Sequence, residues 1–455
     1  MAISPARKTA FDILLRVESE GAYVTDLLHE ALGPGVRRED AALTTEISLG
    51  VLRRRALLDF LLERQLKKPV ARLDFPVLTA LRMGLYQLRY LDKIPARAAV
   101  NESVELVKRA RKSSAAPLVN AVLRRTVAET SLPAETLIPA NLPPAEQLAI
   151  LHSHPEWMIE RWLDQFGDAQ TIQTLEADNL PPRLSAVVHH ASSRDKVFSA
   201  LAKAGLRIED GALLRDAFSV NGGSPSHTTA FREGLFSIQD EASQAVPLLL
   251  GARPGDRVLD LCAAPGGKTA PLVRASGTSG LVVAADRHTH RLRAMDAHFR
   301  RIRLAPVSLI ELDAARPLPF GALFHRILVD APCSGTGTLA RHPEIRWRLS
   351  VENIRALRAL QIAILLAAVR QLAAGGRLVY STCSLEREEN ENVVEAALAR
   401  SPGLRLASRE TVVSELQPHL VSGVSAESLI DSSGFFRTLP GEQPCDGFFA
   451  AVLDK

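Results

Sequence analysis

The sequence predicts a chain of three parts: an all-helical N-terminal domain, a small α+β segment, and a C-terminal α/β domain built on a Rossmann-like, doubly wound sheet. Two observations lead to this prediction. Through residues 1–130, apolar side chains recur at helical spacing, and no segment is typical of a strand. From Gly255 onward, short apolar runs alternate with helical segments, which is the pattern of parallel strands joined by helices. The length of 455 residues suits about three domains.

The helical part covers residues 1–130 and carries an excess of positive charge. It holds 22 Lys and Arg against 15 Asp and Glu, a net charge of +7, whereas the whole chain has +4. Such a segment is either an ordinary solvated surface or a surface that faces phosphates. The basic runs Arg53–Arg55 and Lys108–Lys112 are the candidates for phosphate contacts, and Trp347, further along the chain, is a candidate for stacking on a base.

The middle of the chain changes character twice. Residues 131–150 contain four prolines and are predicted to be a linker. Residues 151–235 are predicted to form the small α+β segment. It should hold a short helix that opens at His154, a strand over 184–188, and a helix over 195–204 that Gly205 ends.

Residues 236–455 are predicted to form the α/β domain. Its strands are expected at 258–261, at 281–286, at 307–312, in a run ending at Asp330, in a run leading into Cys383, and at 447–453. A long amphipathic helix is expected from Val351 to Ala374, where Gly375-Gly376 should stop it, and another over 388–400. Residues 401–440 are predicted to be rich in loops.

The turn after the first of these strands predicts a cofactor site. It consists of small residues that lead into a helix start: Cys262, Ala263, Ala264, Pro265, Gly266, Gly267 and Lys268. The Gly-x-Gly-x-x-Gly fingerprint of dinucleotide-binding proteins is absent, and a cysteine stands where a Walker P-loop requires glycine. The remaining cofactor for this architecture is S-adenosylmethionine, with Asp286 on its ribose and Asp313 near its adenine.

Two of the four cysteines follow predicted strands and indicate covalent chemistry. Cys333 comes shortly after the apolar run Ile327–Val329, and Cys383 comes after Leu378–Tyr380. Ligand sites in open α/β sheets form at the carboxyl ends of the strands. The two thiols are therefore expected at one edge of the sheet.

The composition excludes several classes of protein. The apolar runs are too short to span a membrane, and the N-terminus lacks the apolar core of a signal peptide. With few cysteines and no export signal, the chain is expected in the reducing cytoplasm, without disulfides. No cluster of Cys and His has the spacing of a zinc site, so no metal is expected. We expect a monomer.

Several ordered motifs resemble those of the Sun (Fmu) family of RNA cytosine-C5 methyltransferases. They are Leu259–Thr269, Asp330–Gly337 and Tyr380–Ser384, with shorter matches at Ile238–Ser243, Arg341–Trp347, Glu388–Asn390 and Asp446–Phe449. Residues Ile94–Glu102 and Val119–Arg125 resemble the NusB-like RNA-binding domain of the same family. The resemblance implies a NusB-like domain over 1–130, an RNA-contacting subdomain over 151–235 and an S-adenosylmethionine-dependent methyltransferase domain over 236–455. It also implies 16S rRNA as the partner.

Carried over residue by residue, the resemblance gives each site residue a role. Cys262 to Lys268 would line the cofactor, and Asp330 would face both the cofactor and the target base. Cys383 would be the nucleophile and Cys333 would help to release the product. This chemistry needs a thiolate, because its addition to carbon 6 of cytosine makes carbon 5 enamine-like and able to accept a methyl group. Asp330 would stabilise the charge that develops at N3.

Three other functions fit part of the pattern. The substrate could be tRNA, which only the NusB-like domain argues against. A catalytically silent RNA-binding assembly factor would not need Cys383, Cys333 and Asp330, all of which are intact. A DNA cytosine methyltransferase attacks with its Pro-Cys thiol and has no counterpart of the Thr-Cys thiol.

Overall fold

The computed structural model describes residues 3–33, 35–66, 68–190 and 193–455. The chain divides into two compact units, Met1–Pro181 with Leu339–Arg348, and Pro182–Thr338 with Leu349–Lys455. Among the described residues, no helix is long and apolar enough to cross a membrane. Nor does any group of three or more His, Cys, Asp and Glu in these ranges have a geometry that could hold a metal ion.

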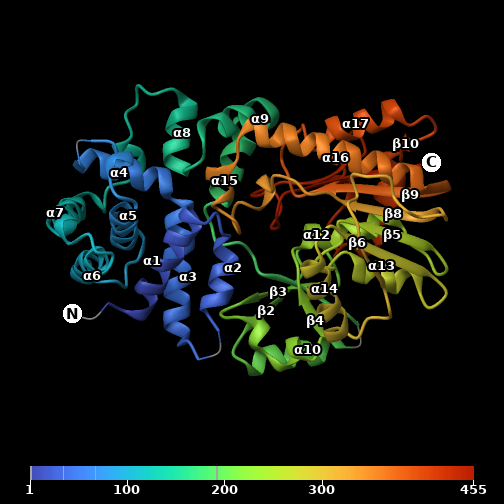
Figure 1. Ribbon diagram of the computed structural model, residues 1–455, viewed down its shortest axis with the longest axis horizontal. Coiled ribbons are helices and arrows are strands. Elements are labelled where there is room, and N and C mark those ends of the chain that lie inside the picture. The colour runs from blue at the N-terminus through green and yellow to red at the C-terminus, as the bar shows by residue number, and fades with distance from the viewer. Residues whose placement is uncertain (1–2, 34, 67, 191–192) are drawn as a thin grey trace. The chain divides into compact units, whose positions relative to one another are not determined.

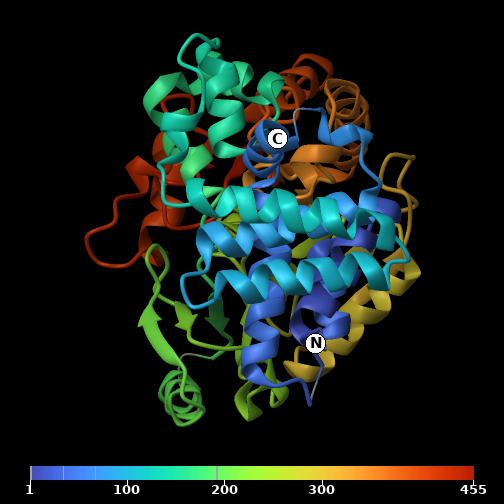
Figure 2. The ribbon, with the colours of Figure 1, turned by 90° about the vertical axis from the view of Figure 1, so that its left-hand side faces the viewer.

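The first unit begins with a bundle of helices. They are α1 (Pro5–Ser19), α2 (Val24–Ala31), α3 (Arg38–Arg53), α4 (Arg55–Leu66), α5 (Phe75–Tyr90), α6 (Ala96–Arg109) and α7 (Ala116–Thr126). Helix α5 is central, since every residue from Val77 to Gln87 is buried. Gly50 lets α3 approach it, because a Cβ there would lie 2.0 Å from Cζ of Tyr86. Figure 2 shows these helices packed side by side, in blue to cyan, and the predicted all-helical domain is confirmed.

Residues 131–181 continue this unit with two more helices, α8 (Pro144–His152) and α9 (Glu156–Ala177). Pro144 stands in the first turn of α8, where its missing N–H removes no helical hydrogen bond. Helix α9 is longer than the short helix that the sequence predicts at His154, because the chain resumes its helix after a kink at Gly167. The domain boundaries given by the sequence stay a prediction.

The second unit opens with the small α+β part. Its sheet has the order β2-β3-β1-β4, and all its pairs are antiparallel. The strands are β1 (Ser185–Val188), β2 (Arg207–Asp210), β3 (Ala217–Asn221) and β4 (Phe236–Ile238). Helix α10 (Arg194–Lys203) buries Val197 and Leu201 in the same core as Phe218 and Phe236. The predicted α+β segment is confirmed.

The main sheet has the order β10-β12-β9-β8-β5-β6-β7, and β11 pairs with β12. Its strands are β5 (Arg257–Leu261), β6 (Leu281–Asp286), β7 (Ser308–Glu311), β8 (Phe324–Asp330), β9 (Leu372–Thr382), β10 (Arg405–Leu406), β11 (Phe436–Thr438) and β12 (Phe448–Asp454). The five strands from β9 to β7 are parallel, and β12 runs antiparallel to β9. This is the predicted Rossmann-like sheet with an antiparallel addition at one side.

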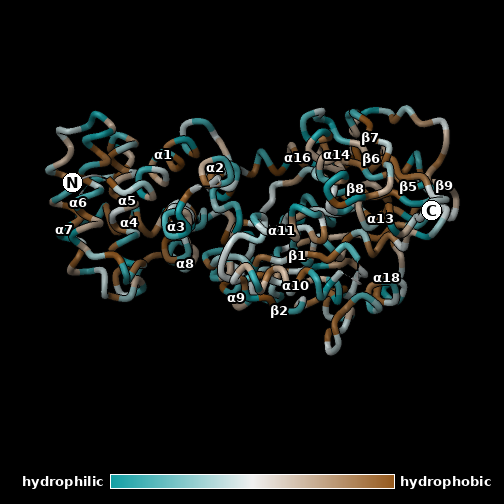
Figure 3. Tube along the Cα trace, turned by 90° about the horizontal axis from the view of Figure 1, so that it is seen from below, coloured by the Kyte–Doolittle hydropathy of each residue, from teal (hydrophilic) through white to brown (hydrophobic). Residues whose placement is uncertain are grey.

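Helices cover both faces of this sheet (Figure 1). On one face lie α12 (Glu241–Ala245), α13 (Thr269–Ser276) and α14 (Thr289–Arg301), and on the other lie α16 (Val351–Gln371) and α17 (Glu391–Arg400). Alternate strand residues supply the two cores: Val258 packs in the cluster that holds Leu272 of α13, and Leu259 in the cluster that holds Leu365 of α16. Figure 3 shows hydrophobic residues, in brown, along these central strands.

One predicted helix end is wrong. Helix α16 ends at Gln371, and the next strand begins at Leu372, so that Gly375-Gly376 lies inside β9. Gly375 has a positive φ of +72°, and the ladder between β8 and β9 shifts register at this place. The chain's last residue pairs with the glycines, since Gly375 N donates to Lys455 O at 2.7 Å. The glycines therefore form an irregular stretch of strand instead of a helix stop.

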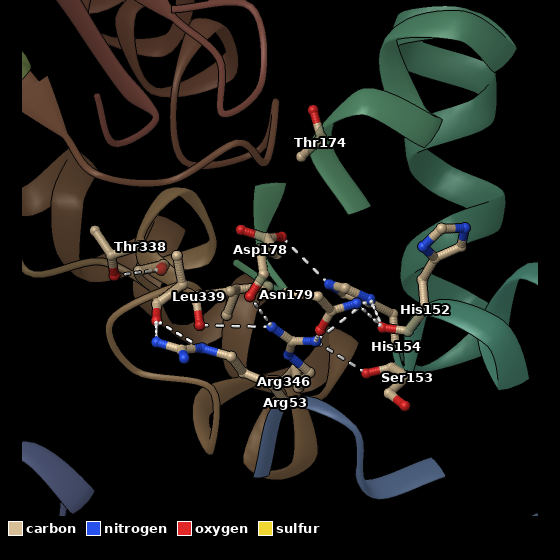
Figure 4. Close-up of polar contacts among 12 residues, drawn as sticks. Arg53, His152, Ser153, His154, Thr174, Asp178, Asn179, Thr338, Leu339 and Arg346 are labelled. Carbon is tan, nitrogen blue, oxygen red and sulfur yellow. Dashed lines mark hydrogen bonds and ion pairs between the residues drawn. The ribbon is translucent and has the colours of Figure 1, made fainter. Parts of the chain in front are cut away.

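Residues 339–348 belong to the first unit, although the residues before and after them in the sequence belong to the second. Arg346 of α15 (Ile345–Arg348) anchors this segment. The guanidinium of Arg346 is fully buried and donates to Ser153 O at 3.0 Å, Asn179 Oδ1 at 3.2 Å and Asp178 O at 3.2 Å (Figure 4). Burial lowers the pKa of Arg346 to about 10. A buried cation that donates to several backbone and side-chain acceptors holds this segment in place.

Replacing this anchor should destabilise the protein. Arg346→Ala leaves buried oxygens without a donor and opens a cavity, which should cost about 3 kcal/mol or more of the free energy of unfolding, measured in urea. Arg37→Ala is the control, because that side chain is exposed and its loss should change little. Equal unfolding midpoints for the two variants would contradict the anchoring role.

Candidate active site

The two cysteines singled out in the sequence lie next to each other. Cys333 follows β8 and Cys383 follows β9, and these neighbouring parallel strands pair Asp330 with Ser381. The two Sγ atoms are 3.3 Å apart, within hydrogen-bond distance, although fifty residues separate them in the sequence. The backbone continues the contact, since Gly337 N donates to Cys383 O at 2.9 Å. The sheet thus delivers both thiols to one place at its carboxyl edge.

One thiol of the pair, that of Cys333, is harder to ionise than an ordinary cysteine. The hydrogen bond to Cys383, together with burial, raises the pKa of Cys333 well above its ordinary value. Cys333 therefore keeps its proton at neutral pH in this arrangement.

Asp330, the last residue of β8, stands between the thiols and the predicted cofactor loop. Its Oδ1 accepts a hydrogen bond from Ser381 Oγ at 2.8 Å, and its Oδ2 lies 2.7 Å from Lys268 Nζ. Lys268 comes from the loop after β5, so an ion pair joins that loop to the strand that precedes Cys333. The carboxylate is held in one orientation from both sides.

The loop from Cys262 to Lys268 connects β5 to α13 and has the backbone of a ligand-binding turn. Gly266 has a φ of +97°, and a Cβ there would lie 2.7 Å from the Phe299 ring. Beneath the loop, Asp260 accepts a hydrogen bond from Thr269 Oγ1 at 2.6 Å and so ties the start of α13 to β5. Burial raises the pKa of Asp260 to about 7.

Two more predicted carboxylates lie at or just after the ends of the next strands. Asp286 ends β6, and its oxygens accept hydrogen bonds from His288 N at 3.0 Å and Ala264 N at 3.3 Å. Asp313 follows β7 and accepts from Ala315 N at 3.1 Å. Each carboxylate oxygen can accept a second hydrogen bond. Acceptors for ribose hydroxyls, anions for a sulfonium and a turn without side-chain bulk are the groups that S-adenosylmethionine requires, so these residues fit that cofactor.

A residue to which the sequence assigned no role joins the two cysteine loops. Glu389 is fully buried, and its Oε1 accepts from Ser334 N and from Gln361 Nε2, both at 2.9 Å. Its Oε2 accepts from Ser384 Oγ at 2.6 Å and also from Ser334 Oγ. Ser334 directly follows Cys333 and Ser384 directly follows Cys383, so one carboxylate fastens both loops. The only signal in the sequence was its place in the motif Glu388–Asn390.

The basic runs and Trp347 make contacts within the first unit. In the run Lys108–Lys112, Arg109 pairs with Asp12 and Lys112 with Asp74. Arg53 donates to Ala340 O at 2.6 Å. The Trp347 indole donates to Leu52 O at 3.2 Å, with the guanidinium of Arg55 5.3 Å from its ring centre. These contacts give the side chains a structural role, and their contacts with RNA stay a prediction.

Comparison with known proteins identifies the three parts of the chain. The family described as 16S rRNA methyltransferase RsmB/F matches residues 247–454, and the NusB family matches residues 4–128. A ferredoxin-like domain of RsmF/B-like methyltransferases matches residues 154–227.

Relatives match along the whole chain. The probable ribosomal RNA small subunit methyltransferase B of Bacillus subtilis is 31% identical over 461 residues, which cover 100% of each chain. The ribosomal RNA small subunit methyltransferase B of Pseudomonas putida is 38% identical over 393 residues, which cover 84% of this chain and 87% of that protein. A solved methyltransferase homolog from Pyrococcus horikoshii has a TM-score of 0.56 at 28% identity and covers 69% of this chain and 100% of that chain. The chain belongs to the RsmB/F family of 16S rRNA methyltransferases and carries that family's NusB and ferredoxin-like domains.

Proposed function

We propose that this protein transfers a methyl group from S-adenosylmethionine to carbon 5 of a cytosine in 16S rRNA, through a covalent bond between Cys383 and carbon 6. The observation that carries the proposal is the pair of thiols, whose Sγ atoms are 3.3 Å apart. Shortly before Cys333 in the sequence, the carboxylate of Asp330 forms an ion pair with Lys268 of the predicted cofactor loop. The names of the relatives support small-subunit rRNA as the substrate.

The reaction begins at Cys383. Its thiolate adds to carbon 6 of a cytosine that is unpaired or turned out of its helix. The electron pair of the 5,6 double bond then becomes available at carbon 5, and Asp330 stabilises the base by sharing a proton at N3. Ion pairing with Lys268 at 2.7 Å keeps Asp330 oriented for this contact. Bound S-adenosylmethionine supplies the electrophilic methyl group that carbon 5 takes up.

Cys333 acts in the second half of the reaction. The carbon 5 proton must leave, the bond between Cys383 and carbon 6 must break, and the 5,6 double bond must return. In the adduct Cys383 is a thioether, so the hydrogen bond between thiols that keeps the pKa of Cys333 high is gone. Cys333 then ionises more easily and gives its own proton to water. As a thiolate it can take the carbon 5 proton as a general base, while Cys383 leaves as a thiolate.

The cofactor loop and the strand-end carboxylates give a binding prediction. Asp286→Asn removes a charged acceptor beside the loop, which should weaken S-adenosylmethionine binding by roughly 10–100-fold, the effect of about 1.5–3 kcal/mol for a hydrogen bond to a charged group. Isothermal titration with the cofactor measures the change. Asp296→Asn on α14 is the control and should bind like the wild type, because its partly exposed carboxylate pairs with Arg300. Unchanged affinity in Asp286→Asn would place the ribose elsewhere.

The substrate is tested with unmodified RNA. Purified protein is incubated with methyl-labelled S-adenosylmethionine and transcripts of 16S rRNA or tRNA, and the labelled nucleoside is identified after digestion. We expect 5-methylcytidine at a defined position of 16S rRNA and none in tRNA. Label in tRNA alone would overturn the substrate, label in another nucleoside would overturn the chemistry, and no label in either RNA would favour a silent assembly factor.

A further inference from the structure

A cavity of about 190 Å³ lies in the second unit beside helix α13. Ala270, Pro271 and Arg274 of this helix line one wall together with Gly267 of the preceding loop, and the end of β1 with the residue after it lines another with Val187, Val188 and His189. Gly267 is the only residue that the cavity shares with the predicted cofactor loop, and no catalytic candidate lines it. The cavity is therefore a site separate from the thiols and the strand-end carboxylates.

Arg274 lines the cavity, and its side chain has no partner in the part of the chain that the structure describes. Among the described residues it makes no hydrogen bond or ion pair, and its Nη2 is a buried atom without an acceptor. Burial lowers its pKa, as expected for a cation that no anion compensates. Arg274 as a whole is only partly buried, but a buried guanidinium nitrogen without an acceptor is a donor that an anion can satisfy.

His189 also lines this cavity. Its ring is buried, and its Nδ1 has no partner among the described residues. The other nitrogen, Nε2, lies 2.8 Å from Ser237 Oγ, and that oxygen already accepts a hydrogen bond from Arg301 Nη2 at 3.2 Å. When the Ser237 hydroxyl donates its proton to Nε2, all its hydrogen-bonding capacity toward these two neighbours is used, and the neutral imidazole carries its hydrogen on Nδ1.

The surroundings are basic. His298 stacks edge-on to His189 with ring centres 6.5 Å apart, and Arg301 Nη2 lies 3.1 Å from His298 Nδ1. The acidic side chain of the lining is Asp216, which is exposed, whereas Arg274 is partly buried and His189 is buried. A guanidinium and an imidazole N–H, with the Arg301 cation nearby, form a donor set for an oxyanion.

We propose that Arg274 and His189 bind a phosphate group, and that in the working enzyme this is a backbone phosphate of the RNA strand that carries the target cytosine. The inference rests on the proposed RNA methylation. Helix α13 starts directly after Lys268, the partner of Asp330, and Arg274 lies about 10 Å further along the helix axis. A phosphate at this place would fix the register of the strand that enters the active site, without touching the reacting base.

The test compares Arg274→Gln with Arg300→Gln, a matched loss of one positive charge from an exposed position on α14. For Arg274→Gln we expect RNA binding weaker by several-fold, and a slope of log K against log salt reduced by about 1, the loss of one phosphate contact. KM for RNA should rise while kcat stays at the wild-type value. Arg300→Gln should keep the wild-type Kd and slope.

Further measurements separate the possible sources of the anion. Inorganic phosphate should raise the melting temperature of the wild type and not that of Arg274→Gln. A phosphate-dependent shift with unchanged RNA binding would assign the site to a free phosphate and overturn its RNA role. A lost affinity for S-adenosylmethionine would assign Arg274 to the cofactor's carboxylate and also overturn the proposal. Arg274→Met keeps the volume without the charge, and without ligand it should melt no lower than the wild type, because an unpaired charge is removed.

The proposed phosphate site and the proposed methyl transfer can be disproved independently of each other. If the wild type methylates a cytosine of 16S rRNA and Arg274→Gln binds that RNA like the wild type, only the phosphate site is wrong. If the wild type methylates no cytosine, the proposed function is wrong, and the binding constants and salt slopes still report whether Arg274 contacts a phosphate.

Discussion

Cys383→Ala should abolish methyl transfer, and Cys333→Ala should leave the protein covalently attached to its RNA. Without the Cys383 thiolate, carbon 5 of cytosine stays a poor nucleophile, so the rate should fall by at least about 10⁴-fold. Without Cys333, attack and methylation still occur, but the adduct loses the base that starts its breakdown. The positioned base should be worth roughly 10²–10⁴-fold in the release step.

Denaturing gels with labelled 16S rRNA distinguish the two variants. Cys333→Ala should show a slowly migrating protein–RNA species whose formation requires S-adenosylmethionine or is increased by it, and Cys383→Ala should show none. The double variant should also show none, because the bond to carbon 6 needs Cys383. Cys445→Ala, a cysteine outside the thiol pair, should turn over like the wild type. An adduct that persists in Cys383→Ala would reverse the roles of the two thiols.

The positions of the site residues could be predicted because they depend on a general property of the fold. Parallel strands end at the same edge of a sheet, so residues that follow apolar runs, such as Asp330 and Cys383, are brought together whatever lies between them. The same reasoning placed Asp286 at the end of β6, where the structure has it. The sequence motifs and their order along the chain then indicated the family.

The contacts that depend on side chains could not be predicted in this way. The 3.3 Å between the thiols follows from a register that pairs Asp330 with Ser381, and no local pattern encodes that register. The cavity at Arg274 needs residues at the end of β1 and residues of α13 to line the same space, although about eighty residues separate the two elements. The sequence wrongly predicts that Gly375-Gly376 stops a helix, because glycine ends helices more often than it lies in an irregular strand.

Glu389 is the site residue whose loss should be most informative after that of the thiols. Glu389→Ala leaves the donors of Ser334, Ser384 and Gln361 without their shared acceptor, at a cost of about 1–3 kcal/mol for each buried group. The loops that carry Cys333 and Cys383 would then no longer be held at a fixed separation. Since catalysis depends on geometry to within a fraction of an ångström, kcat should fall by roughly 10²–10³-fold.

Glu389→Gln removes the negative charge of this side chain and keeps its hydrogen bonds to the two cysteine loops. Its Oε1 can still accept from Ser334 N and Gln361 Nε2, and its amide can donate to the serine hydroxyls, which accept as well as donate. The loops should keep their places, and kcat should fall by no more than about tenfold, the effect of about 1.4 kcal/mol. The negative charge of Glu389 contributes to the raised pKa of Cys333, so its removal should move the pH dependence of adduct release toward lower pH.

A role limited to stability would give a different result. It would lower the fraction of folded enzyme and leave the pH profile and the kcat of the folded fraction unchanged, which active-site titration by adduct formation measures. Glu395→Gln, on the exposed face of α17, is the control and should match the wild type in every readout. RNA and cofactor affinities should be normal in both Glu389 variants, because the carboxylate contacts the loops that hold the thiols and not the predicted cofactor loop. A wild-type kcat in Glu389→Ala would show that the thiols keep their geometry without it.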